Sequence, residues 1–153
     1  MKNSKKIMAA TLLIAVGYAG LASAHSQAGA VGLANSGVAR TDVYVVHCIA
    51  PGTKLWLRVK GLAPVKVPLV STQATKYIAS SVLSTDTVDG DALYSTTVVL
   101  AAGSGDYTLN VNKSAYTGTL AAHNGPQTYV AEFHCQNAAG SHTDTTWDMT
   151  QNQ

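Results

Sequence analysis

The amino-acid sequence predicts a single antiparallel β-sandwich of about seven or eight strands. The main observation is a series of short segments in which apolar and polar residues alternate, as they do in half-buried strands. Turn sequences such as Pro51-Gly52, Asp89-Gly90 and Asn124-Gly125 separate these segments. The second observation is that no segment after the first two dozen residues has the apolar spacing of an amphipathic helix. The 153 residues suffice for one domain.

The composition excludes several other classes of protein. Charged residues make up 12% of the chain, about half of the ~25% that is usual in globular domains, and Glu132 is the only glutamate. A coiled coil, a charged disordered tail and a helical bundle all need more charge or more helix-forming residues. With two cysteines, the chain also lacks the ligands for a dense disulfide scaffold or a four-cysteine zinc site.

Residues 1–24 are predicted to be a secretory signal peptide that is cleaved. Three lysines within the first six residues precede an uncharged, mostly apolar stretch over 7–21, and Ala22-Ser23-Ala24 has the small residues of a cleavage site. The apolar stretch is shorter than the ~20 residues that a membrane-spanning helix needs. We therefore expect an exported protein, periplasmic or extracellular, with no transmembrane segment after cleavage.

Cleavage changes the net charge. The whole chain has ten Lys and Arg against eight Asp and Glu, and three of the lysines leave with the signal peptide. The remaining seven against eight give a net charge of −1. Such a chain has no basic surface for nucleic acid or anionic lipid, so neither is an expected partner.

The mature chain is expected to consist of a small-residue arm over 25–40 and a sandwich domain over 41–153. Because the arm is rich in glycine and alanine, we interpret it as a flexible leader or a weak edge strand. Pro68 restricts the third strand of the domain to an edge or a bulge. The expected strands cover residues 42–50, 54–60, 65–70, 76–83, 92–100, 107–112, 127–136 and 143–149.

Cys48 and Cys135 are predicted to form a disulfide. Export compartments permit disulfides, and both cysteines lie in expected strands on the faces that carry the large apolar residues. This bridge and the strand number resemble immunoglobulin-like sandwiches, a resemblance that implies architecture and no function. The chain departs from that family at Trp56, which is on the polar face of its strand, and at Phe133, where such domains have a tyrosine two residues before the second cysteine.

Cleavage after Ala24 would make His25 the first residue of the mature protein. An N-terminal histidine offers its amine and an imidazole nitrogen, which chelate Cu(II) once a second imidazole completes the site. This resembles the histidine brace of lytic polysaccharide monooxygenases and of some periplasmic copper carriers. The candidates for the second ligand are His47, His123, His134 and His142.

The alternation of side chains along a strand restricts the direction in which two of these histidines can point. His47 and His134 each precede a cysteine, so each points away from the face of the disulfide. If the bridge joins two sheets, the two imidazoles lie on opposite outer surfaces, and we expect both to be exposed.

Other possible sites have weaker support in the sequence. The three carboxylates within residues 86–91 could contribute to a calcium site, but Asp89-Gly90 is the ordinary sequence of a hairpin turn, which we favour. Trp56 or Trp147 could stack on a sugar ring, although single outward aromatic residues are common on sheets. No nucleophile elbow, phosphate-binding loop or pair of catalytic carboxylates is present, so we expect no catalytic residues.

These observations lead to one expected function and one alternative. The first is a secreted, non-enzymatic β-sandwich that serves as a structural or interaction module of the cell envelope or of an extracellular assembly. Its partners would be other proteins or copies of itself, bound through edge strands or through the arm over 25–40. The alternative is an extracytoplasmic copper-binding protein that uses His25 at its mature N-terminus.

Overall fold

The computed structural model describes residues 25–32, 39–115, 118 and 125–153, and the predicted signal peptide over 1–24 lies outside these residues. The described chain is built from β-strands and contains no helix. The strands are β1 (His25–Val31), β2 (Arg40–Cys48), β3 (Lys54–Gly61), β4 (Val70–Lys76), β5 (Ala79–Ser80), β6 (Ser84–Thr85), β7 (Val98–Ala101), β8 (Gly105–Lys113), β9 (Gln127–Gln136) and β10 (Thr145–Gln151).

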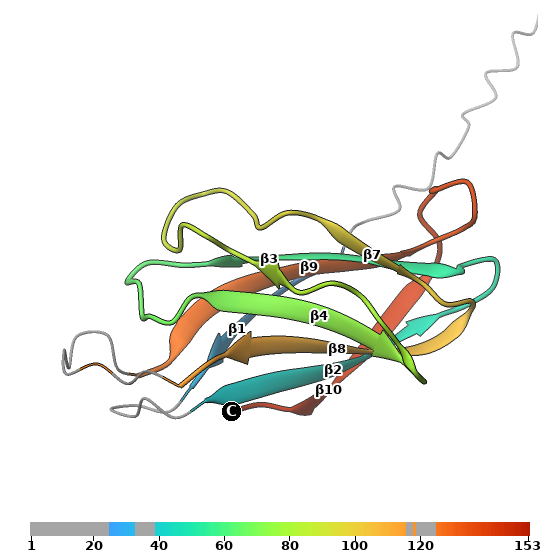
Figure 1. Cartoon of the computed structure of the whole chain (residues 1–153). Helices are drawn as coiled ribbons and strands as arrows, with labels where there is room; N and C mark the ends of the chain where they lie inside the picture. The colour runs from blue at the N-terminus through green and yellow to red at the C-terminus, as the bar shows by residue number, and fades with distance from the viewer. Residues whose placement is uncertain (1–24, 33–38, 116–117, 119–124) are drawn as a thin grey trace, which may run out of the picture.

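Two antiparallel sheets form a sandwich-like arrangement (Figure 1). One sheet has four strands in the order β1-β9-β3-β7, and the other has six, in the order β10-β2-β8-β4-β5, with β6 also paired to β4. Alternation puts every second side chain of the long strands into the space between the sheets. In β3, for example, Leu55, Leu57 and Val59 are fully buried. The prediction of an all-β chain with antiparallel pairing is therefore confirmed.

The strongly alternating segments were predicted closely. β9 has the predicted bounds, and β2, β3, β8 and β10 each differ from prediction by one or a few residues at their ends. These strands carry large apolar side chains at every second position, which is the pattern that a sheet with one buried face imposes.

The predictions for three other segments were wrong. The strand expected over 65–70 starts only at Val70, after Pro64 and Pro68, which have no amide hydrogen for a sheet ladder. The strand expected over 76–83 is instead the hairpin between β4 and β5. β4 was not predicted, because its buried side chains after Val70 are those of Thr72, Ala74 and Lys76. The strand therefore does not show the alternation of large apolar and polar residues that marks the other strands. Of the strand expected over 92–100, the structure has only the short strand β7 (Val98–Ala101).

Of the two alternatives for the arm, the structure has an edge strand over His25–Val31. β1 pairs with β9 along its whole length, and Val31 is fully buried in the core. The glycine content has a packing reason, because a Cβ on Gly29 would lie 2.5 Å from the ring of Tyr129. Gly29 thus makes room for a large side chain from the neighbouring strand.

The edges formed by β1 and β10 are tied to each other. The amide of Gly32, just after β1, donates a hydrogen bond of 2.7 Å to the carbonyl of Gln153, just after β10. The amide of Gln153 in turn donates to the buried carboxylate of Asp42 on β2. These contacts connect the two sheets along one side of the molecule.

The predicted disulfide is present. Cys48 of β2 and Cys135 of β9 are bonded, with their Cα atoms 5.4 Å apart, and both are buried. Since β2 and β9 belong to different sheets, the bridge joins the two layers through the core.

Candidate functional site

The outer face of the four-stranded sheet carries a row of stacked side chains. Trp56 of β3 and His134 of β9 are paired in register, and their ring centroids are 4.4 Å apart. The ring of His142, in the connection to β10, packs against that of His134, with the ring centroids 3.6 Å apart and the planes tilted by 33°. His134 is buried, with 4% of its surface exposed. Thus aromatic rings cover this histidine, which the sequence analysis expected to be exposed.

Two positively charged side chains, Arg58 and Lys60, extend this set of contacts to Tyr94. The Arg58 guanidinium lies 5.0 Å from the ring of Trp56 and 4.2 Å from that of Tyr94. Arg58 also forms an ion pair of 2.6 Å with Glu132, and the ammonium group of Lys60 lies 4.6 Å from Tyr94. We call the whole set the stacked row; its members are His142, His134, Trp56, Arg58, Tyr94 and Lys60.

The contacts of Trp56 and Trp147 can be compared with the possibility that one of these rings stacks on a sugar. Trp56 already contacts His134 and Arg58 through its ring system. Trp147 is partly buried against the core, with its ring edge-to-face with those of Tyr44 and Phe133. Both tryptophans therefore stabilise the fold, and neither geometry favours a sugar-stacking role.

His134 is the most unusual member of the stacked row. Its Nδ1 atom is buried without a hydrogen-bond partner, while its Nε2 atom lies 3.1 Å from the side-chain amide of Gln136. Burial lowers the pKa of His134 to about 4, and the charges of His142, Arg58 and His25 act in the same direction. The ring is therefore neutral at neutral pH, as a metal-binding imidazole must be.

His25 lies at the start of β1, beside this cluster. It pairs with Phe133 in the β1–β9 register, so it is one position from His134 across the strands. The His25 ring is 6.4 Å from the ring of Phe133, at an interplanar angle of 28°, and therefore points toward the core side of the sheet. The imidazole of His134 points to the other face.

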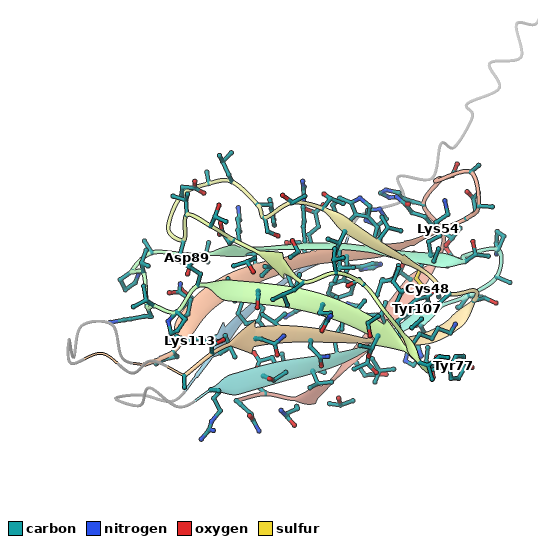
Figure 2. All side chains as sticks on the ribbon, in the orientation of Figure 1. Cys48, Lys54, Tyr77, Asp89, Tyr107 and Lys113 are labelled. Carbon is teal, nitrogen blue, oxygen red and sulfur yellow. A yellow bond between two sulfur atoms is a disulfide. The ribbon has the colours of Figure 1, made fainter. Side chains whose placement is uncertain are left out.

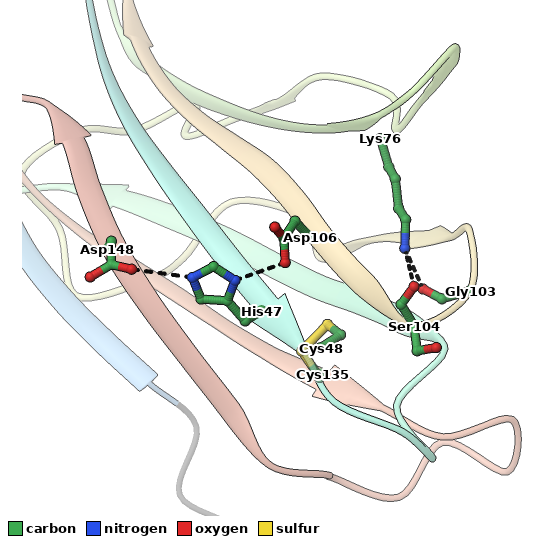
Figure 3. Close-up of polar contacts among 8 residues, drawn as sticks. All are labelled: His47, Cys48, Lys76, Gly103, Ser104, Asp106, Cys135 and Asp148. Atoms are coloured by element: carbon green, nitrogen blue, oxygen red, sulfur yellow. Dashed lines mark hydrogen bonds and ion pairs between the residues drawn. A yellow bond between two sulfur atoms is a disulfide. The ribbon is translucent and has the colours of Figure 1, made fainter.

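His47 lies on the outer face of the six-stranded sheet (Figure 3). Its Nδ1 atom is 2.8 Å from Asp106 of β8, and its Nε2 atom is 3.2 Å from Asp148 of β10. The hydrogen bonds that these two carboxylates accept, the one to Asp106 having the larger effect, raise the pKa of His47. The predicted placement of His47 and His134 on opposite outer surfaces is confirmed, so the two cannot share a metal ion. His123 lies outside the described residues.

Asp86 and Asp89 form a buried pair that the sequence analysis did not expect. The favoured turn is present at Asp89-Gly90, but the exposed fractions of Asp86 and Asp89 are only 4% and 8%. Asp86 accepts hydrogen bonds from the amides of Gly61 and Val88, at 2.8 and 3.2 Å. The sequence signal for this pair was Asp-x-x-Asp-Gly, which we interpreted only as a turn.

Neither carboxylate oxygen of Asp89 makes a hydrogen bond of good geometry, although the Val70 backbone and the Asp86 carboxyl group lie near it. Its carboxylate packs against Gly61, where a Cβ would lie 2.2 Å from Oδ1. Burial, followed by the charge of Asp86, raises the pKa of Asp89 to about 6, while a backbone contact with Val70 and the charge of Lys113 oppose this shift. Asp89 and Lys113 lie at the end of the molecule opposite Tyr77 (Figure 2).

The β4–β5 hairpin exposes large apolar side chains. Tyr77 and Ile78 form its tip, with 94% and 103% of their surfaces exposed, and Val82 and Leu83 follow with 73% and 54%. Tyr77 has a positive φ of 52°, a conformation that is uncommon for a bulky residue. We call Tyr77, Ile78, Val82 and Leu83 the apolar edge.

Neither a ready-made metal site nor a membrane helix is found in the part of the chain that the structure describes. No group of three or more His, Cys, Asp or Glu side chains there could hold a metal ion. No helix in that part is long and apolar enough to cross a bilayer. Comparisons with protein-family models, with curated proteins and with solved structures found no match.

Proposed function

We propose that this chain is an exported, non-enzymatic β-sandwich of the immunoglobulin-like type that acts as an interaction module of the cell envelope or of an extracellular assembly. The disulfide between the two sheets supports both the architecture and an oxidising compartment. The predicted signal peptide supports export.

The observation that carries the proposal is the apolar edge. Large apolar side chains that are grouped and exposed mark interaction surfaces more often than isolated ones do. Tyr77 and Ile78 occupy a tight hairpin tip, where glycine, asparagine and aspartate are the usual residues. The positive φ of Tyr77 costs free energy, and strain of this kind is concentrated at functional positions. Since β1 already pairs with β9 of its own chain, the hairpin is a better contact surface than the arm.

The first partner to test is a second copy of the chain. The experiment is sedimentation velocity of the mature protein, starting at His25, over a wide concentration range. We expect reversible self-association that is lost in a Tyr77→Asn/Ile78→Ser variant, in which asparagine tolerates the positive φ. The matched control is Leu93→Ser, which removes another exposed leucine (70% exposed) outside the apolar edge. A mature protein that stays monomeric at every concentration, or equal effects in variant and control, would count against the apolar edge as a self-association surface.

Copper binding at the mature N-terminus is the second candidate function. The observation that favours it is that β1, an edge strand, begins at His25, so cleavage before this residue would put its amine at the free start of a sheet edge. The test is a Cu(II) titration of the mature protein and of a chain with one extra alanine before His25. The extra residue removes the terminal amine from the chelate, so binding should weaken strongly.

A further inference from the structure

The six-stranded sheet carries a hollow with a volume of about 310 Å³. Residues from three neighbouring strands and one residue that precedes β6 are among those that line it: Arg40, Thr41, Ser71, Leu83 and Asn112. Ser71 and Asn112 are paired in register, and both follow the alternation of strands whose next residues point into the core, so the hollow opens on the outer face of the sheet. Pockets for small molecules have volumes of about 300–1,000 Å³, so this hollow is at the lower limit and fits a single large side chain.

The hollow and the tip of the β4–β5 hairpin lie at opposite ends of β4. The strand starts beside Lys113, which also lines the hollow, and it ends at Lys76, directly before Tyr77. Figure 2 labels Lys113 and Tyr77 at the two ends of the molecule. The distance along an extended strand from Ser71 to Tyr77 is about 20 Å. One copy of the chain therefore cannot place its own hairpin tip in its own hollow.

The polar groups of the hollow suit a tyrosine side chain. Within the described part of the chain, the Arg40 guanidinium donates one hydrogen bond, of 3.1 Å, to the carbonyl of Ala39, so its other N–H groups remain for a partner. Asn112 accepts a hydrogen bond of 2.8 Å from Thr41 through its side-chain oxygen, which leaves its amide nitrogen as a donor. A guanidinium attracts the face of an aromatic ring, and a buried phenol hydroxyl usually has a hydrogen-bond partner.

The hairpin tip offers such a side chain. Although the Lys76 ammonium lies 5.8 Å from the ring of Tyr77, 94% of Tyr77 is exposed, so this ring is accessible to a second molecule. Ile78, beside it, is fully exposed. Leu83 belongs to the apolar edge and also lines the hollow, so the hollow has an apolar contact for Ile78 next to the polar groups that suit Tyr77.

We propose that the hairpin tip of one copy, Tyr77 and Ile78, docks in the hollow around Arg40 of a second copy. This inference rests on the proposed function and names the surface that the apolar edge binds. Because the tip and the hollow are different surfaces, each pair of copies keeps one free tip and one free hollow. Copies therefore add head to tail, into an open chain or a ring, whereas a contact between two tips would stop at a symmetric dimer.

The test is sedimentation velocity of two variants of the mature protein, alone and mixed. Tyr77→Asn/Ile78→Ser loses the tip but keeps the hollow, and Arg40→Glu keeps the tip but loses the cation of the hollow. Each variant alone should self-associate more weakly by about tenfold or more. An equimolar mixture should form a heterodimer and no larger species, because it contains one kind of intact tip and one kind of intact hollow. The matched control is Lys60→Glu, which makes the same charge change on the other sheet and should associate like the original protein.

The results separate this inference from the proposed function. If Arg40→Glu self-associates as strongly as Lys60→Glu, the hollow is not the docking site. If the tip variant still loses association in that case, the apolar edge stands as the interaction surface. If the original protein does not associate at any concentration, self-association through the apolar edge fails, and this inference fails with it.

A second measurement leaves the hollow unaltered. Isotope-labelled Tyr77→Asn/Ile78→Ser protein, which keeps the hollow, is titrated with the unlabelled original protein and followed by NMR. Docking should shift the amide signals of Thr41, Ser71 and Asn112 and leave those of β9, on the other sheet, unchanged. An absence of shifts at these three residues, or equal shifts throughout β9, would overturn the proposal, even if Arg40→Glu failed to fold.

Discussion

The phenol of Tyr129 donates a hydrogen bond of 2.7 Å to the carboxylate of Asp42, from one sheet to the other across the core. Both residues are fully buried, and the hydroxyl groups of Tyr129 and Tyr44 lie 2.6 Å apart. Burial raises the pKa of Asp42, while hydrogen bonds from the Gln153 amide and from Tyr129 lower it. The core therefore contains a polar connection whose parts come from β2, β9 and the end of the chain.

Replacing Tyr129 with phenylalanine should remove this connection and leave a buried carboxylate with one donor fewer. Hydrogen bonds to charged groups stabilise proteins by about 1.5–3 kcal/mol, so the free energy of unfolding should fall by about that amount. Urea unfolding of the variant measures the change. Tyr77→Phe, at the exposed hairpin tip, is the control and should have little effect. Equal stabilities of Tyr129→Phe and the original protein would show that the hydrogen bond contributes nothing net.

Gly29→Ala should also destabilise the protein, although alanine is usually tolerated in an edge strand. The added Cβ would lie 2.5 Å from the Cζ and Oη atoms of Tyr129, so the ring or β1 must move. Overpacking of this kind costs about 1–3 kcal/mol, to be measured by the same urea titration. Ser26→Ala, at an exposed position of β1, serves as the control. An unchanged midpoint for Gly29→Ala would mean that Tyr129 does not lie over this glycine.

Asp89 should make stability fall as pH rises. The pKa of Asp89 is raised from its ordinary value of 3.8 to about 6 in the folded protein, so the folded state holds this proton more tightly than the unfolded state. The corresponding stabilisation is complete below about pH 4 and is lost as pH rises toward 6 and above. Asp89→Asn cannot ionise, so its stability relative to the original protein should increase between pH 4 and pH 8, by an amount on the order of 1–3 kcal/mol.

Unfolding free energies of both proteins at several pH values test this prediction. A difference that stays constant with pH, or one that decreases, would contradict the raised pKa of Asp89. Asp91→Asn, in the same segment but partly exposed, is the matched control.

His47 should titrate above its ordinary pKa because of its two aspartates. Its hydrogen bonds to Asp106 and Asp148 favour the protonated ring, so their contribution to stability is present below the unfolded pKa and is lost as pH rises through the folded one. All three side chains are partly or largely exposed, so the effect on stability is small. The direct measurement is an NMR titration of His47, in which Asp106→Asn and Asp148→Asn should each lower the pKa. Unchanged titration curves would show that these pairs do not persist in solution.

Loss of the disulfide should strongly destabilise the protein. Cys48 and Cys135 are separated by 87 positions, and the chain-entropy model assigns about 4–5 kcal/mol to a bridge that closes such a loop. That is a large share of the ~5–15 kcal/mol of a typical domain, so a Cys48→Ala/Cys135→Ala variant should melt at a much lower temperature. Peptide mapping of the purified protein without reductant should recover the linked pair. Two free thiols there would contradict the bridge.

The sequence was informative where a strand has one buried and one wet face. β3 and β9 alternate large apolar and polar residues, so both their bounds and their inward faces could be predicted. β4 could not, because its inward row includes Thr72 and Lys76. The Lys76 ammonium is held inside by hydrogen bonds to the carbonyls of Gly103 and Ser104, which are distant in sequence (Figure 3).

For the candidate sites too, some features could be predicted from the sequence and others could not. Cleavage that exposes His25 stays a prediction from the sequence, whereas the alternation correctly predicted that His47 and His134 lie on opposite surfaces. It could not show that Trp56 and His142 bury His134, or that Asp89 packs against Gly61. These arrangements depend on which strands are neighbours and on how long connections return to the sheet, and no local pattern encodes either.

The sequence by itself thus determined the all-β class, the disulfide partners and the faces of the long strands, because residue type and a period of two residues suffice for these. Only the tertiary structure decided the pairing of β1 with β9, the exposed apolar edge and the burial of His134 and Asp89. The physical reason is that the burial and the pKa of a side chain depend on neighbours from other strands. For β1, the sequence shows only a segment of small residues, which fits a flexible leader as well as a weak edge strand. The packing alone shows that Tyr129 needs the space above Gly29.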